Sequence, residues 1–502
     1  MKLKLIYRNN STGNDIVAYF KKNCLEMECF NFEINGEEYQ EIVAEFDPPD
    51  FELIINDIQP ILNCLHNETC ESILTLNGIT SDLSKSQSTN KIYEILLFNM
   101  SIISINQVTY TKTTINQKYI SEKQVPKISE LAKKTANLMG LDFAMVKINS
   151  NGQRKLTVLE VNPCPDIRSK DKKALFSHLE EMVKQYVQYI NKKPVVKLGA
   201  DPEFMIANSR NDKMIPASEF FPREGTVGCD NIRIPNRQQR PIAELRPHPD
   251  TSPFVLQTNL KSSLEQANRM VPYKNIKMLA GSQPFPGYSI GGHIHFSGLN
   301  INGHILRTLN NYLGLPIFMI ENQQTSVKRR KKYGFLCDFR VKEYGGFEYR
   351  TPGSWLVSPE ISLAALCLAK LVSSNYVHLR RNFFYSIEAY RAFYRGDTQF
   401  FKSQFYILWD DIKNLDDYSM YEQELAIIPQ MIEQDQSWDE IADIRKTWHL
   451  KKNYSKRYVS ARTGTGTGST VVYSSSINRQ TSSNRRAYTA SNSYHSARRY
   501  ML

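Results

Sequence analysis

Four strand-like runs between residues 195 and 360 each carry ionisable side chains at alternate positions, and this pattern limits the possible fold more than any other feature of the chain. Alternate residues of a strand point to the same face of a sheet. Each run therefore offers carboxylate, imidazole or guanidinium groups to one face. We expect an antiparallel sheet, curved into a half-barrel, to bring these faces together around divalent cations and a polyphosphate.

The first run, residues 198–206, contains Asp201 and Glu203 with Pro202 between them. Two neighbouring carboxylates repel each other unless a cation lies between them, so the pair indicates a metal site. Proline cannot donate a backbone hydrogen bond, which favours an edge strand or the start of a strand. The alternative interpretation is a solvated Asp-Pro-Glu turn.

The second cluster consists of Asp230, which follows Gly228 and Cys229, and of residues 242–247 beyond a basic loop. In the latter run Glu244 and Arg246 share a strand face. Their proximity to the first run in the proposed sheet would add acids to the same cation site. The alternative is a strand that carries an exposed ion pair.

The third run, residues 288–298, has His293 and His295 two positions apart, directly after Gly291 and Gly292. Two imidazoles on one strand face suit a metal or phosphate site. A glycine pair lets a ligand approach the main chain closely. The alternative is that the histidines are packed residues without a ligand.

The fourth run, residues 345–354, places Glu348 and Arg350 on one strand face. Arginine is well suited to hold a carboxylate or a phosphate through two parallel hydrogen bonds. Arg340 and the basic residues 328–332 precede this run. For the basic residues 328–332 the alternative is a solvated loop.

The rest of the chain mixes strands and helices. Hydrophobic periodicity predicts a helix over residues 128–139 that ends at Gly140, and a hairpin of strands 143–149 and 155–161 around Asn151 and Gly152. The remaining expected elements are strands at 2–7, 52–55, 72–77 and 102–105 and helices at 90–97, 175–190, 361–372 and 421–445.

The charge of the chain is concentrated at its end. The net charge is +12 over 502 residues, and residues 451–502 hold ten Lys or Arg and no Asp or Glu. The remainder is near neutral, which argues against a nucleic-acid-binding body, although the tail has the charge to contact an acidic surface. From residue 455 on, the Ser, Thr, Tyr, Arg and Gly composition predicts disorder.

Cysteine usage and hydropathy favour a cytoplasmic protein. The eight cysteines are scattered without a CxxC motif, and the start of the chain is typical of a first strand, not of a signal peptide, so we expect reduced thiols. No run of 18 apolar residues exists, which excludes an apolar membrane-spanning segment.

The motifs DPEF, GxD followed by AELRP, GGHIHFSG and GGFEYRTPGS, in this order, resemble the carboxylate–amine ligase (amidoligase) branch of the glutamine synthetase-like superfamily, and most closely its phage-type members. The resemblance covers residues 195–360 and continues into the following helices. It implies a sheet whose acids bind several Mg²⁺ or Mn²⁺ ions, with ATP and a carboxylate substrate at opposite ends.

The resemblance also implies roles for individual residues. One departure is Asp201, because many relatives of glutamine synthetase have glutamate there. The implied metal ligands are Asp201, Glu203, Asp230, Glu244, His293 and Glu348. The implied nucleotide or substrate contacts are His295 and Ser297, and Arg350 would stabilise the transferred phosphate, with Arg246 and Arg340 as further phosphate or carboxylate contacts.

Residues 131–148 and 157–165 are similar to the C-terminal end of ATP-grasp ligases, and residues 77–78 and 86–97 to the segment that leads into that domain. In that family the positions of Glu160 and Asn162 hold Mg²⁺. However, Lys147 stands where the family has an acid, and few residues separate Gln107 from Leu131, too few for the strands that grip a triphosphate. We therefore interpret the region as a shortened, catalytically silent ATP-grasp that binds a substrate or scaffolds the rest.

These observations predict an α+β chain: an N-terminal α/β ATP-grasp-like region (1–193), a glutamine synthetase-like curved antiparallel sheet with helices (195–450) and a disordered basic tail (451–502). The expected function is an ATP- and Mg²⁺-dependent ligase that joins carboxylate- and amine-bearing substrates, including peptides or proteins, through an acyl phosphate.

Three alternatives remain open. One is an inactive structural or binding protein of a phage particle or of a spore or envelope layer that keeps the ligase fold. The others are a metal-dependent hydrolase or lyase and a guanidino kinase.

Overall fold

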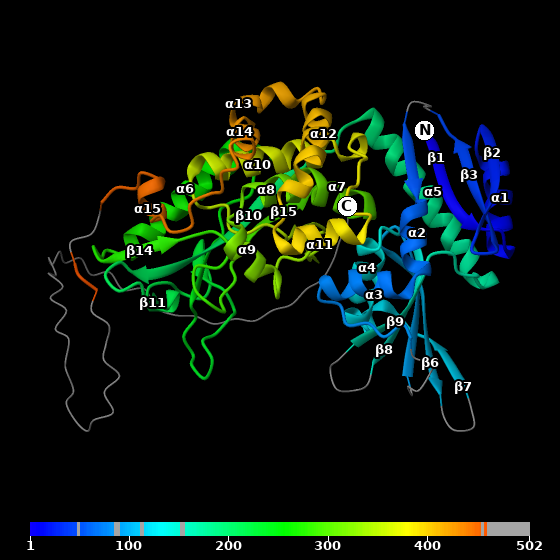
Figure 1. Ribbon diagram of the computed structural model, residues 1–502, viewed down its shortest axis with the longest axis horizontal. Coiled ribbons are helices and arrows are strands. Elements are labelled where there is room, and N and C mark those ends of the chain that lie inside the picture. Colours follow the sequence, from blue (N-terminus) through cyan, green and yellow to red (C-terminus); the bar gives the residue numbers. More distant parts are fainter. Residues whose placement is uncertain (48–50, 85–90, 111–114, 151–155, 453–455, 459–502) are drawn as a thin grey trace, which may run out of the picture. The chain divides into compact units, whose positions relative to one another are not determined.

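The computed structural model describes residues 1–47, 51–84, 91–110, 115–150, 156–452 and 456–458 of the chain (Figure 1). Residues 1–458 form one compact unit, and 459–502 belong to a second unit that lies outside the described residues, as do the Asn151–Gly152 turn and most of the expected disordered tail. Among the described helices, none is both long enough and apolar enough to span a membrane.

The first sheet has four strands in the order β2-β3-β1-β4. Strands β1 and β4 are parallel, and the other pairs are antiparallel. The expected strands at 2–7 and 52–55 are thereby confirmed. The bounds are β1 Lys2–Arg8, α1 Ser11–Asn23, β2 Glu26–Ile34, β3 Glu37–Glu45, β4 Glu52–Ile55, α2 Ile58–Leu65 and α3 Asn67–Leu76.

The second sheet is antiparallel, with the order β7-β6-β5-β8-β9. It confirms the predicted strand pair at 143–149 and 155–161 and the strand at 102–105. The helix at 128–139 is also confirmed, and Gly140 follows it with a positive φ of 78°. The bounds are β5 Lys91–Phe98, β6 Ser101–Tyr110, β7 Ile115–Tyr119, α4 Pro126–Leu138, β8 Phe143–Ser150, β9 Leu156–Asn162 and α5 Ser169–Asn191.

Two sequence predictions in this region are wrong. The expected strand at 72–77 lies in helix α3, where Cys70, Ile73 and Leu74 are buried at helical spacing. The expected helix at 90–97 is strand β5. This strand lies between β6 and β8 and is apolar on both faces, so it lacks the alternation that marks a half-buried strand.

The third sheet has eight antiparallel strands and contains all four predicted runs. Six strands follow the order β12-β13-β10-β15-β17-β16, and β11 and β14 also pair with β10. The chain is thus α+β, as the sequence predicts. The bounds are β10 Lys197–Asn208, β11 Met214–Ile215, β12 Val227–Cys229, β13 Ile242–Leu245, β14 Ile276–Leu279, β15 Gly292–Ser297, β16 Phe339–Val341 and β17 Phe347–Tyr349.

Helices pack around this sheet (Figure 1). The buried helix expected at 361–372 is α10. The prediction of one continuous helix at 421–445 is wrong. The chain leaves the helix after Glu433, because Trp438 is buried and its backbone N–H donates to Ile320 O. The bounds are α6 Pro253–Met270, α7 Gly303–Leu309, α8 Leu315–Ile320, α9 Gln323–Arg330, α10 Pro359–Ser374, α11 Ile387–Arg395, α12 Lys402–Lys413, α13 Glu422–Leu425, α14 Ile427–Glu433 and α15 Ile444–Thr447.

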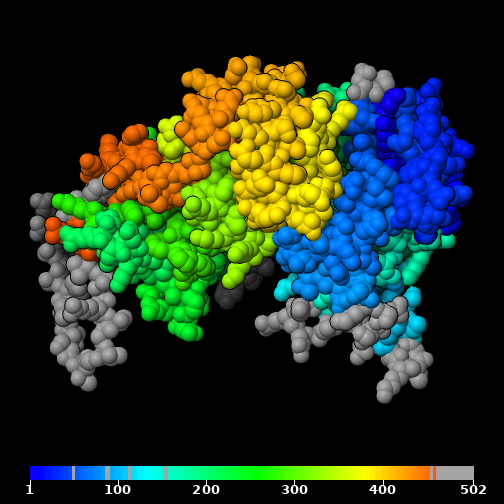
Figure 2. Space-filling view, viewed as in Figure 1, coloured from blue at the N-terminus to red at the C-terminus, as the bar shows by residue number. Residues whose placement is uncertain are grey.

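Residues 1–193 pack directly on residues 195–450. Helices α3 and α11 lie side by side, and Figure 2 shows the light-blue atoms of the first region against the yellow atoms of the second. The Tyr390 hydroxyl donates to Leu138 O at 2.6 Å, and the Asn63 amide donates to Tyr385 O at 2.7 Å. The two regions therefore share a polar as well as an apolar interface.

Candidate active site

Three adjacent strands bring the predicted residues together. In the antiparallel register, Asp201 of β10 lies opposite His293 of β15, and His295 lies opposite Glu348 of β17. His295 Nε2 is 2.7 Å from Asp201 Oδ1, and His293 Nδ1 is 3.3 Å from Glu348 Oε1. Residues that are far apart in the sequence thus meet on one face of the third sheet.

The donor atoms fit a divalent cation. Two groups of three residues have ligand atoms within 4.8 Å of one another: Asp201, His295 and Glu348, and Asp201, Glu244 and His293. Among the described residues, neither ring nitrogen of the buried His293 makes a hydrogen bond. Unpaired imidazole nitrogens facing carboxylates are the donors that Mn²⁺ or Mg²⁺ can share.

Glu203 and Glu244 extend the acidic face, because they are register partners on β10 and β13. Burial, followed by the nearby Asp230 and Glu244 carboxylates, raises the pKa of Glu203 well above its usual value. Burial and Asp201 raise the pKa of Glu244 to about 8. Acids crowded in this way are stabilised in their charged form by a bound cation.

His293 is held neutral. Burial lowers its pKa to about 4, although Asp201 opposes that shift. A neutral imidazole keeps a lone pair free for a metal ion.

A cationic rim surrounds Glu348, whose side chain is only 1% exposed. Its carboxylate lies 2.5 Å from Lys342 Nζ, 3.0 Å from Arg350 Nε and 3.3 Å from a terminal nitrogen of Arg340. Burial alone would raise the pKa of Glu348, but the cationic Lys342 and Arg350 help to bring it below its usual value. This concentration of positive charge beside acids suits a polyphosphate next to a cation site.

Lys342 and Tyr344 also belong to the site, although the sequence motifs do not contain them. Lys342 and Tyr344 lie in the connection between β16 and β17. The Tyr344 hydroxyl is 3.3 Å from His295 Nδ1. A signal was present, because Arg340, Lys342 and Tyr344 alternate like the predicted residues.

Arg350 is fixed by a network behind the rim. Its guanidinium stacks 5.0 Å from the Tyr333 ring centre and donates to the Tyr333 hydroxyl at 2.6 Å. Asp338 lies 3.9 Å away, and this carboxylate also binds Lys134 of helix α4 at 3.0 Å. Residues 1–193 therefore contribute one side chain to the support of Arg350.

Four predicted residues lie at the margin of the cluster. Asp230 is half-buried and accepts a hydrogen bond from Ile232 N, and it is in neither group of three. The Ser297 hydroxyl donates to Lys197 O at 3.5 Å. Arg246 pairs with Glu244, and the Arg340 side chain is 54% exposed.

The expectation that Pro202 marks an edge strand or the start of a strand is wrong. Pro202 is inside the central strand β10, where the register with β15 ends and that with β13 begins. An added Cβ at Gly291 would clash with the His293 ring, and one at Gly292 with the Trp355 ring, so both glycines leave room for these neighbouring side chains.

The basic run 328–332 is not a solvated loop. Arg329 and Arg330 lie at the end of helix α9 and are buried. Arg329 donates to Ile290 O and Thr351 O, each at 2.7 Å, and so ties the helix to strand ends of the site.

In the N-terminal region, Lys147 Nζ is 2.7 Å from Glu160 Oε2. Asn162 Oδ1 accepts a hydrogen bond from Cys164 N at 2.9 Å. Both residues that the ATP-grasp resemblance assigns to Mg²⁺ are thus engaged with groups of the chain itself.

A sequence profile described as phage phiEco32-like COOH.NH2 ligase-type 2 matches residues 198–450, which is half of the chain. The chain belongs to this ligase family. The match contains every residue of the cluster described above, and it confirms the resemblance to phage-type carboxylate–amine ligases. No curated protein shows significant sequence similarity to the chain.

Similar solved structures include an ATP-grasp ligase, a glutathione synthetase and a glutamine synthase homologue. The ATP-grasp ligase PsnB, in complex with a precursor variant, Mg and ADP, has 16% identity over 16% of this chain and 25% of its own, with a TM-score of 0.14. A bifunctional glutathione synthetase from Pasteurella multocida has 11% identity over 50% of this chain and 48% of its own (TM-score 0.33). A glutamine synthase homologue has 15% identity over 50% and 73% (TM-score 0.24). The chain thus spans less than half the length of two of these three proteins.

Proposed function

We propose that the chain is an ATP-dependent carboxylate–amine ligase that forms an amide or peptide bond through an acyl phosphate. The observation that carries this proposal is the cluster of Asp201, Glu244, His293, His295 and Glu348, which adjoins the cationic rim. Membership of a ligase family fits such a pairing of an acidic site with a basic one.

Asp201, Glu203, Glu244, His293, His295 and Glu348 would hold Mg²⁺, with Asp230 at the margin. The ions would screen the repulsion between a carboxylate substrate and the triphosphate of ATP. Mn²⁺ is a suitable substitute because two of the donors are imidazoles.

The reaction needs two displacements. A substrate carboxylate oxygen attacks the γ-phosphorus of ATP, which gives an acyl phosphate and ADP. The amine then attacks the acyl carbon, so that phosphate leaves and the amine loses a proton. Arg350, with Lys342 and Arg340 beside it, would neutralise the charge on the transferring phosphoryl group. Ser297, on the same strand as His295, would contact nucleotide or substrate, and Arg246 a carboxylate.

We also propose three functional regions, with boundaries near residues 193 and 450. Lys456–Tyr458 already pack on the second region, since Lys274 N donates to Lys456 O and Asn275 binds Tyr458.

The eight cysteines, all within described segments, form no disulfide. We propose a reducing, ATP-containing cytoplasm as the location of the chain.

The function is tested by mass spectrometry of cell extract supplied with the protein, ATP and Mg²⁺. A ligase yields a product equal to carboxylate plus amine minus water, together with ADP. A phosphorylated guanidino product would indicate a kinase, and ATP-independent turnover a hydrolase or lyase. No change under any condition would favour an inactive structural or binding protein of a particle or coat layer.

The N-terminal region is proposed to be catalytically silent, because the Lys147 ammonium pairs with Glu160 and so lies where the resemblance places a metal ion. Glu160→Ala should leave ADP release within about twofold of the wild type, since the pair is partly exposed and such pairs contribute little to stability. Steady-state kinetics with saturating ATP measures this. A loss comparable to that of an active-site variant would show that the region turns over ATP.

Lys134 is expected to act as a positioning residue for Arg350. Lys134→Met should lower kcat about tenfold with little change in the KM for ATP, because Asp338 would then draw Arg350 away from the site. Lys134→Arg should restore most of the rate. The matched control is Lys133→Met, since the neighbouring Lys133 pairs with Glu122 within residues 1–193; equal losses in both variants would contradict this role.

A further inference from the structure

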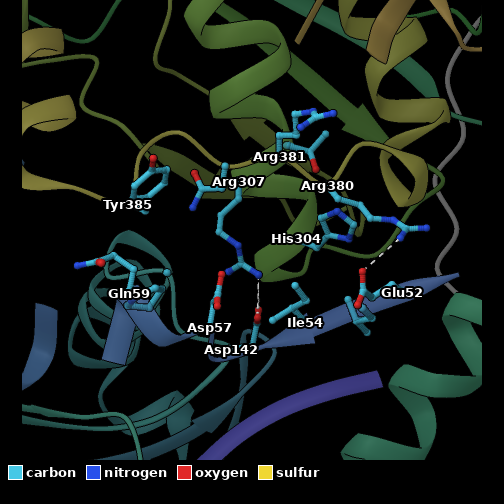
Figure 3. A pocket seen from close by; sticks show the side chains of 15 residues that line it. Glu52, Ile54, Asp57, Gln59, Asp142, His304, Arg307, Arg380, Arg381 and Tyr385 are labelled. Atoms are coloured by element: carbon cyan, nitrogen blue, oxygen red, sulfur yellow. Dashed lines mark hydrogen bonds and ion pairs between the residues drawn. The ribbon is translucent and has the colours of Figure 1, made fainter. Parts of the chain in front are cut away.

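A cavity lies where residues 1–193 meet residues 195–450. It has a volume of about 360 Å³ and contains none of the candidate active-site residues. One wall comes from β4 and the start of α2, and the other from α7 and residues 380–385 (Figure 3). Its volume lies within the range of small-molecule sites.

The carboxylates that line this cavity already have partners. Asp142 accepts two hydrogen bonds from Arg307, at 2.7 and 2.9 Å. Glu52 Oε1 is 2.6 Å from Lys4 Nζ, and Asp57 Oδ1 accepts from Ile58 N at 2.7 Å as the cap of α2. The acids of the cavity therefore leave little negative charge to attract a cationic ligand.

The arginines retain unused donors. Among the described residues, Arg380 makes no hydrogen bond; its nearest carboxylate oxygen, on Glu52, is 4.0 Å away, as the dashed line in Figure 3 marks. Arg381 uses only Nε, which binds Asp411 at 2.7 Å, and its two terminal nitrogens contact no acceptor in the described part of the chain. Arg307 likewise has one buried terminal nitrogen without an acceptor among these residues.

The surroundings of Arg380 indicate that a further hydrogen-bond acceptor would stabilise its guanidinium group. Its side chain stacks 4.5 Å from the Phe51 ring centre and is 40% exposed. Burial lowers the pKa of Arg380, and Glu52 compensates only in part. A partly desolvated guanidinium without a hydrogen-bonded acceptor gains free energy when an oxyanion binds. Arg380 and Arg381 also line a neighbouring cavity, so a ligand can approach both residues from that side as well.

We infer that this cavity binds a small organic anion through a carboxylate or phosphate group held by Arg380 and Arg381. An oxyanion is the ligand because the unused groups are cationic donors with fork geometry. The cavity is larger than one oxyanion, so the rest of the ligand lies along Leu53, Ile54 and Pro60. This inference does not depend on the proposed ligase activity.

The ligand would have a consequence for the whole unit, because the walls of the cavity belong to different regions. A molecule that binds both walls in the folded state raises the stability of their association. The N-terminal region would then act as a ligand-responsive partner of the ligase region.

The test is calorimetric titration of the full chain, free of ATP and divalent metal, with inorganic phosphate and separately with L-glutamate. We expect saturable binding of at least one probe, and the two arms distinguish phosphate from carboxylate recognition. Arg380→Gln combined with Arg381→Gln should weaken that binding at least about tenfold, which corresponds to the loss of charge-assisted hydrogen bonds. Arg381→Gln alone, at a side chain that is 54% exposed, should give part of the loss without risk to the fold.

Two controls locate the site. Arg391→Gln changes an exposed arginine of α11 outside the cavity and should leave binding unchanged. Lys342→Met removes a cation of the candidate active site, and phosphate bound in the cavity should be insensitive to it. Absence of saturable binding of both probes at millimolar concentration, or unchanged binding in the folded Arg381 variants, would overturn the inference.

Discussion

Glu348→Gln is expected to reduce ATP-dependent ADP release by at least about 100-fold, because it removes a proposed charged metal ligand and the carboxylate that the cationic rim surrounds. Glutamine has nearly the same volume, so the packing of β17 is kept. The lost carboxylate leaves Lys342 and Arg340 without their carboxylate partner, and Arg350 with Asp338 alone. A coupled assay for ADP under saturating Mg²⁺ measures the loss.

Glu343 supplies a matched control for this variant. It lies in the same β16–β17 connection and is exposed, and it makes no ion pair among the described residues. Glu343→Gln should therefore keep the wild-type rate. Thermal unfolding of Glu348→Gln should remain cooperative; a folded Glu348→Gln protein with full activity would remove this residue from the mechanism.

Asp201→Asn is expected to remove divalent cation binding at both positions, because Asp201 belongs to both groups of potential ligands. An amide oxygen is a weaker donor than a carboxylate and carries no charge to offset the cation. We expect the affinity for Mn²⁺ to fall about 100-fold or more. Electron paramagnetic resonance of free Mn²⁺ during titration of the ATP-free protein measures it without any turnover.

Two further variants serve as comparisons for the Mn²⁺ affinity of Asp201→Asn. Glu244→Gln should weaken one class of Mn²⁺ sites and spare the other, since Glu244 belongs to one group only. Asp212→Asn changes an exposed acid that pairs with Lys277 beyond the end of β10, and it should have no effect. Wild-type Mn²⁺ affinity in Asp201→Asn would contradict the assignment of the cluster.

Much of the candidate site could be predicted from the sequence because it depends on a local rule. Asp201 with Glu203, and His293 with His295, are two residues apart, so a strand places each pair on one face. The order in which the strands pair is not local. The neighbours of Glu348, including Lys342 and Tyr344, follow from the register of β15, β16 and β17, which the sequence alone did not reveal.

The errors in secondary structure have the same origin. Strand β5 lies inside its sheet, with helices α4 and α5 packed against it, and is apolar on both faces, so its local pattern is indistinguishable from that of a buried helix. The chain after Glu433 leaves the helix to bury Trp438, a contact with α8 that lies far away in the sequence. In both cases tertiary packing overrides the local preference.

The anion cavity was beyond sequence analysis for a related reason. Glu52, Asp142, Arg307 and Arg381 share no motif and come from distant segments. Only their arrangement shows that the acids have partners while the arginines keep unused donors. By contrast, the sequence already shows a cation, Lys147, where the ATP-grasp family has an acid. In the structure this cation pairs with Glu160.

The most direct test of the metal-binding cluster is anomalous diffraction at the manganese edge from crystals of the protein soaked in Mn²⁺. We expect one anomalous peak within the group Asp201, His295 and Glu348 and another within the group Asp201, Glu244 and His293. A cluster that stays empty at a Mn²⁺ concentration that saturates the protein in solution, with the ion bound at another place, would contradict it.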